Sequence, residues 1–136
     1  GYNYRMTNVQ AALGLAQLEQ LEDFISIKKD NYDEYQSLGL KLLPFRKDIR
    51  PNYWFYSYIS EDRDRLLNLL GDKGIQTRPV WRLIHTLKPY INSQTYQIDK
   101  AIYYYDHILN IPCSTNLVNE DLKIVTTAIL EISKLL

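Results

Sequence analysis

The 136-residue sequence contains a single cysteine, Cys113, so an internal disulfide and a multi-cysteine metal site are both excluded. Histidine is also scarce, and its two copies are too few for a convincing metal site. Lys plus Arg equals Asp plus Glu, at 16 each, whereas a nucleic-acid-binding domain normally has a basic excess. No apolar run reaches the roughly 18 residues of a membrane span, and the start does not resemble a signal peptide. We therefore expect a cytoplasmic protein that binds neither nucleic acid nor membrane.

Tyrosine, in contrast, is abundant, with twelve copies, most of which are clustered at positions 2–4, 53–58 and 96–105. Tyrosine rings near arginines could form a stacking surface for single-stranded nucleic acid. The neutral net charge favours the alternative, in which these amphipathic rings cover a half-buried sheet or an interface.

The first part of the chain predicts one long helix, over about residues 8–37. Thr7 suits the N-cap, Gln10 completes a capping box, and Gly39 is the expected stop. The first half of this helix is small and apolar, and the second half is charged with one aromatic edge. Such a helix can belong to two structural units, so we divide the chain into residues 1–39, an active-site loop with a long interdomain helix, and a small domain, 40–136.

The rest of the sequence predicts an α+β fold: a small antiparallel or mixed sheet of about three strands, covered by helices on one side. The strongest strand, residues 53–59, is apolar on both faces and should be central in the sheet or covered on both sides. The other expected elements are a helix capped by Ser60 and closed by Gly71 and Gly74, a strand at 75–78, a loop at 80–90, a helix at 96–109, an extended segment at 108–112 and a last helix capped by Asn119.

Common catalytic signatures are missing, including the G-x-S-x-G elbow, H-E-x-x-H, the P-loop and G-x-G-x-x-G. Two polar clusters remain. Asn3 and Arg5 stand in a loop before a helix N-terminus, where they could bind a phosphate or carboxylate, or simply form a turn and a surface pair. Arg78, Trp81 and His85 combine a planar cation, an indole and an imidazole that could bind an anionic or sugar-like ligand. In the alternative interpretation, Trp81 fills a gap in the core and Arg78 makes a salt bridge.

Two further residues are interpreted as structural. We expect His107, in a tyrosine-rich helix, to be structural or exposed, and Cys113 to be a small buried hydrophobe.

Three separated motifs resemble the DegT/StrS family of pyridoxal-phosphate-dependent sugar aminotransferases. They are G-Y-N-Y-R-M leading into A-A-L-G-L-A-Q-L, then G-I-Q-T-R-P-V-W-R-L-I-H, and finally N-I-P-C-S-T-N-L-V-N-E-D-L. They occur in the family's order at plausible spacing. One departure is Leu83-Ile84, where the family commonly has Pro-Leu before the histidine, and this puts the loop's substrate contacts in doubt.

The resemblance implies a fold type I enzyme that transfers an amino group, usually from glutamate, to a nucleotide-linked keto sugar in bacterial amino-sugar or surface-glycan synthesis. It implies a homodimer with the active site at the subunit interface. Asn3 and Arg5 would bind the cofactor, and Arg78, Trp81 and His85 the substrate. The cofactor-binding lysine would lie in a large domain upstream, so the fragment alone should carry no cofactor and no activity. Two alternatives remain open: a stand-alone interaction domain with a tyrosine-rich surface, and a dehydratase of the same family.

Overall fold

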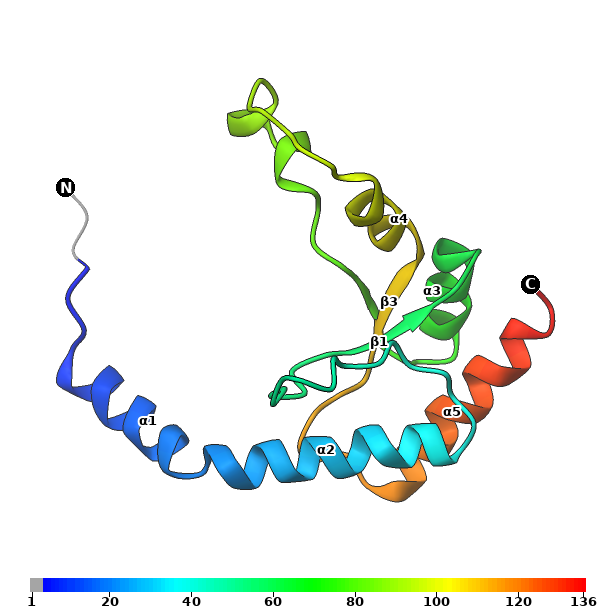
Figure 1. Ribbon diagram of the computed structural model, residues 1–136. Helices are drawn as coiled ribbons and strands as arrows, with labels where there is room; N and C mark the ends of the chain where they lie inside the picture. The colour runs from blue at the N-terminus through cyan, green and yellow to red at the C-terminus, as the bar shows by residue number, and fades with distance from the viewer. Residues whose placement is uncertain (1–3) are drawn as a thin grey trace.

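The computed structural model describes residues 4–136 and shows a small α+β domain from which two arms project (Figure 1). The N-terminal arm is helix α1, and the second arm is the segment between strand β2 and helix α4. In chain order the helices and strands are α1 (Asn8–Glu19), α2 (Leu21–Ser37), β1 (Tyr56–Ile59), α3 (Arg63–Asp72), β2 (Arg78–Pro79), the 3₁₀ turns η1 (Ile84–Thr86) and η2 (Lys88–Tyr90), α4 (Asp99–His107), β3 (Ile108–Ile111) and α5 (Asn119–Ser133).

The long N-terminal helix predicted from the sequence is in fact two helices that meet at Gln20. Gln20 has φ −102° and ψ 3°, and its N–H bonds to the Gln17 carbonyl rather than continuing the α pattern. This break directs α1 away from the domain, and no residue of α1 is buried. The two predicted ends are confirmed: the N–H of Gln10 donates to Thr7 Oγ1 at 3.3 Å, and Gly39, just after α2, has φ +103°.

Strand β3 lies at the centre of the three-stranded antiparallel sheet, whose order is β1-β3-β2. All four residues of β3 are buried. The strand predicted at 53–59 is shorter and lies at the edge of the sheet. Tyr53 has φ +52°, and the N–H of Trp54 donates to the Asn52 side chain at 3.1 Å, so the chain turns before it joins the ladder at Tyr56. The small antiparallel sheet itself is confirmed.

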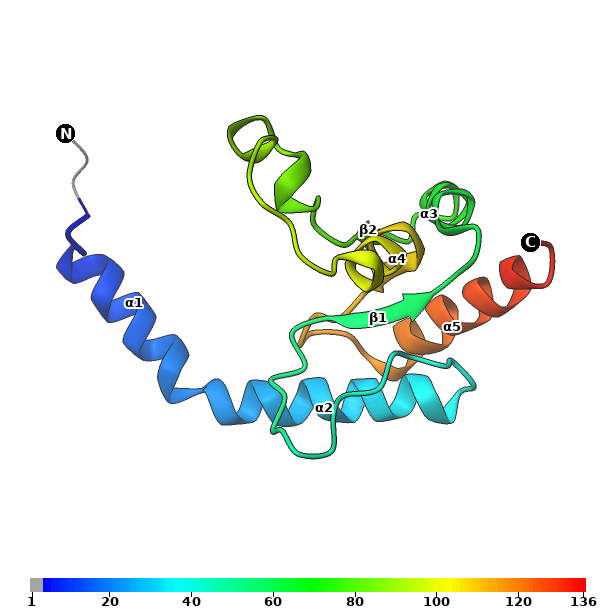
Figure 2. The same ribbon diagram turned by 45° about the horizontal axis from the view of Figure 1, so that its top comes forward.

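The core lies between the sheet and helices α2, α3 and α5. Helices α2 and α5 pack together on one face of the sheet (Figure 2). Tyr35 and Tyr56 are fully buried, with ring centroids 5.8 Å apart, and Tyr32 packs 5.7 Å from Tyr56. These rings fill the space that the short strands leave under α2. The other fully buried large side chains are Leu66, Leu70, Leu109, Leu122 and Ile129.

Three helix starts differ from the sequence prediction. Helix α3 begins at Arg63 with Asp62, not Ser60, as its N-cap. Helix α5 begins at Asn119, and the N–H of Val118 before it donates to the Asp121 carboxylate at 3.1 Å, so Asn119 is not the cap. Helix α4 is shorter than predicted because Gln97, with φ +48°, interrupts the helical backbone two residues before it.

No helix of residues 4–136 has both the length and the apolar character required to cross a bilayer. The division of the chain at residue 39 stays a prediction.

Candidate functional site

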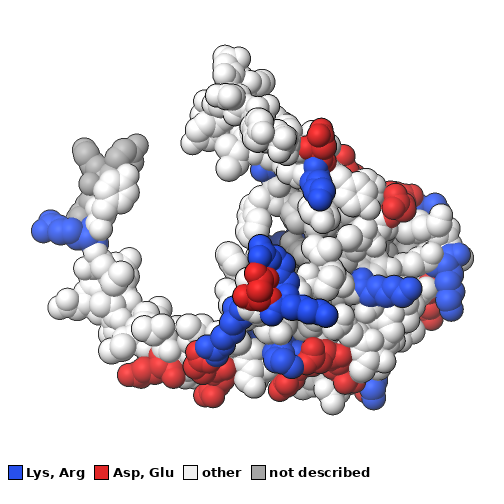
Figure 3. All heavy atoms as spheres, viewed as in Figure 1, with Lys and Arg blue, Asp and Glu red and all other residues white. Residues whose placement is uncertain are grey.

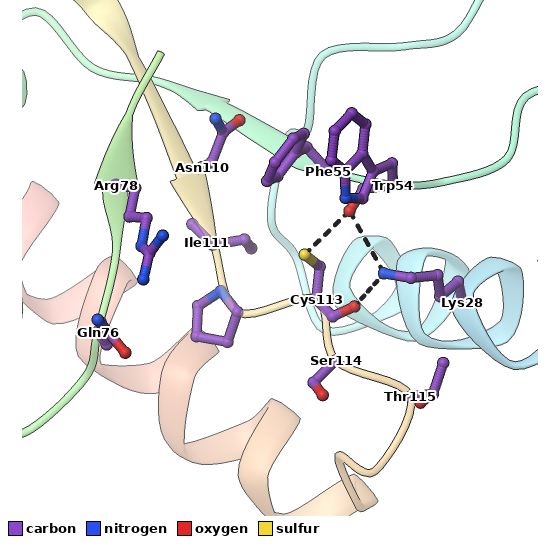
Figure 4. A pocket seen from close by; sticks show the side chains of 11 residues that line it. Lys28, Trp54, Phe55, Gln76, Arg78, Asn110, Ile111, Cys113, Ser114 and Thr115 are labelled. Atoms are coloured by element: carbon purple, nitrogen blue, oxygen red, sulfur yellow. Dashed lines mark hydrogen bonds between the residues drawn. The ribbon is translucent and has the colours of Figure 1, made fainter. Parts of the chain in front are cut away.

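A cavity of about 490 Å³ opens between helix α2, strands β2 and β3, the loop before β1 and the loop after β3 (Figure 4). Figure 4 shows Arg78 on the strand side and Lys28 on the helix side, with Ile111 and Cys113 between them. The size is that of an ordinary small-molecule site. The cavity therefore collects side chains that lie far apart in the sequence.

The Lys28 side chain joins the two loops that border this cavity. Its ammonium group donates to the carbonyl oxygen of Trp54 at 3.3 Å and to that of Cys113. The Cys113 thiol donates to the same Trp54 carbonyl at 3.1 Å. Cys113 is half-buried and packs against the hydrophobic core, as expected for a small hydrophobe, and its thiol makes this polar contact in addition. Lys28 and Cys113 together hold the Trp54 backbone in place.

Three aromatic rings form an exposed cluster beside the cavity, which we call the aromatic cluster: Trp54, Phe55 and Trp81. Trp54 stacks on Phe55 with centroids 4.7 Å apart, and Trp81 contacts them at 5.9 and 5.3 Å. Trp54 is 60% exposed and Trp81 is 68% exposed. Trp81 therefore does not fill a gap in the core. Large exposed rings held in mutual contact are typical of a recognition surface.

Arg78 lies at the other side of the cavity, where strand pairing fixes its backbone. It is the ladder partner of Asn110 in β3, and its side chain is exposed. The Asn110 side chain is buried, and Ser57 donates to its oxygen at 2.9 Å. The Asn110 nitrogen is thus the end of the amide that can donate. A guanidinium group and an amide at one cavity suit an anionic, hydrogen-bonding ligand.

A second cavity, of about 530 Å³, lies within the arm between β2 and α4, and both Trp81 and His85 line it. His85 is half-buried there. The structure thus brings Trp81 against the rings beside the first cavity and His85 into the second. It does not place Arg78 and His85 in one cavity.

The other predicted site residues belong to the N-terminal arm. Asn3 lies outside the described residues, and Arg5 is exposed just before α1. In the view of Figure 3, the α1 arm carries few charged side chains. Its exposed apolar residues include Val9, Leu13 and Leu18. An exposed helix of this composition is suited to packing against another protein surface.

Burial controls the chemistry of the tyrosines next to the site. It raises the pKa of Tyr56 well above the usual range, which keeps the hydroxyl protonated. That hydroxyl donates to the Lys28 carbonyl at 2.6 Å. This hydrogen bond links Lys28, which lines the first cavity, to Tyr56 in the hydrophobic core.

His107 is structural, as predicted. Its ring stacks on Tyr103 at 4.2 Å, Nδ1 lies 2.7 Å from the Tyr103 carbonyl, and Nε2 lies 3.3 Å from Glu61. Within residues 4–136, no three His, Cys, Asp or Glu side chains are grouped so that they could hold a metal ion.

Sequence reasoning missed Lys28, Trp54 and Phe55. The W-F pair before β1 lies within the strand predicted at 53–59, and Lys28 lies in the charged second half of the predicted N-terminal helix. One signal in the sequence could have indicated this: Trp54 closely follows Pro51 and Asn52, two residues that favour a turn.

Residues 1–130 match the sequence profile of the DegT/DnrJ/EryC1/StrS aminotransferase family. The chain belongs to this family. A GDP-perosamine synthase of Escherichia coli O157:H7 is 47% identical over 103 residues, covering 71% of this chain and 28% of that protein. A GDP-perosamine synthase of Caulobacter vibrioides is 31% identical over 140 residues, covering 95% of this chain and 38% of that protein. The chain thus spans well under half the length of these family members.

Solved structures show the same fold. Helicobacter pylori PseC, an aminotransferase involved in pseudoaminic acid biosynthesis, matches with a TM-score of 0.85 at 21% identity, over all of this chain and 40% of that one. DesV of S. venezuelae matches with a TM-score of 0.85 at 24% identity, over 98% of this chain and 38% of that one. The expected α+β fold is confirmed, and these solved aminotransferases share it.

Proposed function

We propose that this chain is the C-terminal part of a pyridoxal-phosphate-dependent aminotransferase that acts on a GDP-linked keto sugar. The amino group would come from an amino acid, with glutamate as the expected donor. The observation that carries the proposal is the match of all three motif regions to the family, with 47% identity to a GDP-perosamine synthase. The same matches favour an aminotransferase over a dehydratase of the family.

The residues of this chain suit a supporting role at the cofactor. When bound, pyridoxal phosphate supplies the electron-accepting ring on which an amino group is transferred. The Arg5 guanidinium is exposed at the foot of α1, close to a helix N-terminus, and Asn3 precedes it in sequence. Both side chains are donors that suit a phosphate group.

Lys28 does not fit the role of the cofactor lysine. Its side chain is half-buried, and its ammonium group donates to two backbone carbonyls, so it is engaged in holding the loops of this domain rather than presented to a cofactor carbonyl. We therefore expect the cofactor lysine in a large domain of a longer polypeptide.

The substrate would bind along the aromatic cluster. Trp81 offers an exposed ring for a sugar, and His85, in the second cavity, can orient a hydroxyl group by a hydrogen bond. Arg78 is exposed on the other side of the cluster and can neutralise a phosphate group. These residues would hold the substrate while the chemistry takes place on the cofactor.

The exposed α1 supports a homodimer with the active site at the subunit interface. Helix α1 exposes apolar side chains on two opposite sides, and a helix of this kind is normally enclosed by protein. Placed against a second subunit, α1 would carry Asn3 and Arg5 to the neighbouring active site.

The test is the reverse reaction of the longer polypeptide that contains this chain. The protein loaded with pyridoxal phosphate is incubated with GDP-perosamine and 2-oxoglutarate. The sugar's amino group should move to the keto carbon of 2-oxoglutarate, so that glutamate and a GDP-linked keto sugar form in equal amounts. A UDP-linked amino sugar is the control substrate and should react far more slowly.

Absence of glutamate formation from a protein that has bound its cofactor would overturn the proposal. The 136-residue chain alone, assayed in parallel, should form none.

A further inference from the structure

The exposed face of helix α5 lies apart from the candidate site. Helix α5 packs against α2 and α3, and it lies at the opposite end of the domain from α1 in both views (Figures 1 and 2). Beyond the first residue of the helix, the exposed side chains fall within one stripe about 100° wide, since each residue turns the helix by about 100°. They are Glu120, Lys123, Ile124, Thr127 and Glu131, and the exposed Lys134 follows directly after the helix.

The charges of this stripe are arranged with opposite signs on the two sides of its middle residue, Thr127. Lys123 and Glu131 each lie four residues from Thr127, and Glu120 and Lys134 each lie seven residues from it. Consider two copies of this helix that pack antiparallel and meet at Thr127. Glu120 then falls opposite Lys134 of the second copy, and Lys123 falls opposite Glu131 of the second copy. The stripe is therefore complementary in charge to itself.

Within one chain these charges are only loosely engaged. Lys123 Nζ lies 4.0 Å from a carboxylate oxygen of Glu120, and Lys73 Nζ lies 3.7 Å from one of Glu131. All four side chains are at least half exposed, and exposed ion pairs of this kind contribute little to stability. The charges thus remain available to a second molecule.

The stripe also adjoins an apolar depression of about 470 Å³, whose lining includes Ile75 and Ala128. Ile124 lies at its edge and is 54% exposed. Because Ile124 is within one helical turn of Thr127, the antiparallel arrangement brings Ile124 of the second copy over the depression beside Ala128. The same arrangement that pairs the charges therefore also covers the apolar surface.

We propose that this face pairs two copies of the chain, with their α5 helices antiparallel and both Thr127 residues at the two-fold axis. The proposal goes beyond the proposed function, because this face contains no residue of the candidate site and differs from the α1 surface. A single helix face is small for a protein interface, so we expect a dissociation constant on the order of 100 µM. The pairing is then dissociated at about 1 µM, and at high concentration it would join dimers that form through α1 into larger assemblies.

The first test uses the position at the two-fold axis, where a residue meets its own copy. All chains carry Leu13→Asp, so that α1 does not contribute, and are sedimented at concentrations from about 10 µM to about 500 µM, over which the parent chain should dimerise. Thr127→Glu and Thr127→Lys each bring two like charges together and should raise the dissociation constant at least about tenfold. An equal mixture of these two variants should pair at least as tightly as the parent, because the two charges then attract. Gln36→Glu, on the exposed side of α2, is the matched control and should dimerise like the parent.

Disulfide trapping tests the orientation of the two helices. In chains that also carry Cys113→Ser, Glu120→Cys and Lys134→Cys are oxidised separately and as a mixture. The antiparallel arrangement predicts a cross-link in the mixture only, because these two positions meet each other and not themselves. Thr127→Cys should cross-link to its own copy.

A parent chain that is folded by circular dichroism but sediments as a monomer up to about 500 µM would overturn the proposal. A dimer that Thr127→Glu leaves intact would place the contact on another face, and self cross-linking of Glu120→Cys would show that the helices are parallel; either result rejects the proposal. Amino transfer by the longer polypeptide is measured independently, so a failure of the α5 contact leaves the proposed function standing.

Discussion

Tyr56 and Lys28 are joined at two points: the Tyr56 hydroxyl donates to the Lys28 carbonyl at 2.6 Å, and the Lys28 ammonium lies 5.6 Å from the centroid of the same ring. This pair connects edge strand β1 to helix α2, and its Lys28 side chain lines the first cavity. Removing the hydroxyl by Tyr56→Phe leaves a buried carbonyl without that donor. The free energy of unfolding should fall by about 1 kcal/mol, measured by urea denaturation of the 136-residue chain.

The neighbouring tyrosine should respond in the opposite direction. Tyr35 is fully buried, and its hydroxyl has no hydrogen-bond partner among the described residues. Burying a hydroxyl without a partner costs free energy. Tyr35→Phe should therefore leave the free energy of unfolding unchanged or raise it by up to about 1 kcal/mol. A loss as large as that of Tyr56→Phe would show that the hydroxyl is paired.

These two tyrosines also predict how stability depends on alkaline pH. Burial, with a smaller Coulombic contribution from Cys113, raises the pKa of both above the unfolded value of about 10. The stabilisation is thus fully present below pH 10 and is lost as pH rises above it, because only the unfolded chain then releases these protons. Each tyrosine should reduce the free energy of unfolding by about 1.4 kcal/mol per pH unit in that range.

The tyrosine variants test this slope. Tyr35→Phe should remove one tyrosine's share of the fall above pH 10, measured by urea denaturation at a series of pH values. Tyr96→Phe, at a residue that is 77% exposed, is the matched control and should leave the slope as it is. An unchanged slope in Tyr35→Phe would contradict the prediction.

Substitution of Lys28 tests whether helix α2 holds the loop that carries Trp54. Lys28→Met keeps the length of the side chain but removes the donor to the carbonyls of Trp54 and Cys113. The unfolding free energy should fall by about 1–3 kcal/mol, because the part-buried Cys113 carbonyl and the more exposed Trp54 carbonyl lose a charged donor. The tryptophan fluorescence anisotropy should fall as well. Lys29→Met, at the next residue on α2, removes only an exposed ion pair with Asp33 and should leave the free energy of unfolding nearly unchanged.

The sequence allowed the local features to be predicted, and the failures have physical causes. The capping box could be predicted because Thr7 and Gln10 are only three residues apart. The stop at Gly39 could be predicted because it depends on the backbone conformation of that one residue. The break at Gln20 could not, because Gln20 is an ordinary helix residue and the turn there leaves α1 outside the small domain. The edge position of β1 was not predicted, because the apolar residues at 53–59 suggested a strand covered on both faces. In the structure, Trp54 and Phe55 belong to the aromatic cluster instead of to the strand.

The candidate site shows the same limit. Arg78, Trp81 and His85 were identified from one loop, but their separation into two cavities depends on how the arm folds. Lys28 reaches the site from a helix that is 26 residues from Trp54 and 85 from Cys113. Such long-range contacts leave no local pattern in the sequence.

Helix α1 provides the test of the assembly. Val9 and Leu13 lie on one side of it and Leu15 and Leu18 on the other, and all four are exposed by more than half. Because none is buried in this chain, Leu13→Asp should change the unfolding free energy of the 136-residue chain by less than about 0.5 kcal/mol. In the longer polypeptide the same charge would enter an apolar interface, where an unpaired carboxylate is costly.

The Leu13→Asp protein should therefore sediment as a monomer, or with a dimer dissociation constant raised at least about tenfold, in analytical ultracentrifugation. Gln36→Asp, which places the same charge on the exposed side of α2, is the control and should remain dimeric. If Leu13→Asp sediments as a dimer with wild-type affinity, α1 does not form the subunit interface. Arg5 could then not reach a neighbouring active site, and its role at the cofactor would have to be sought within its own subunit.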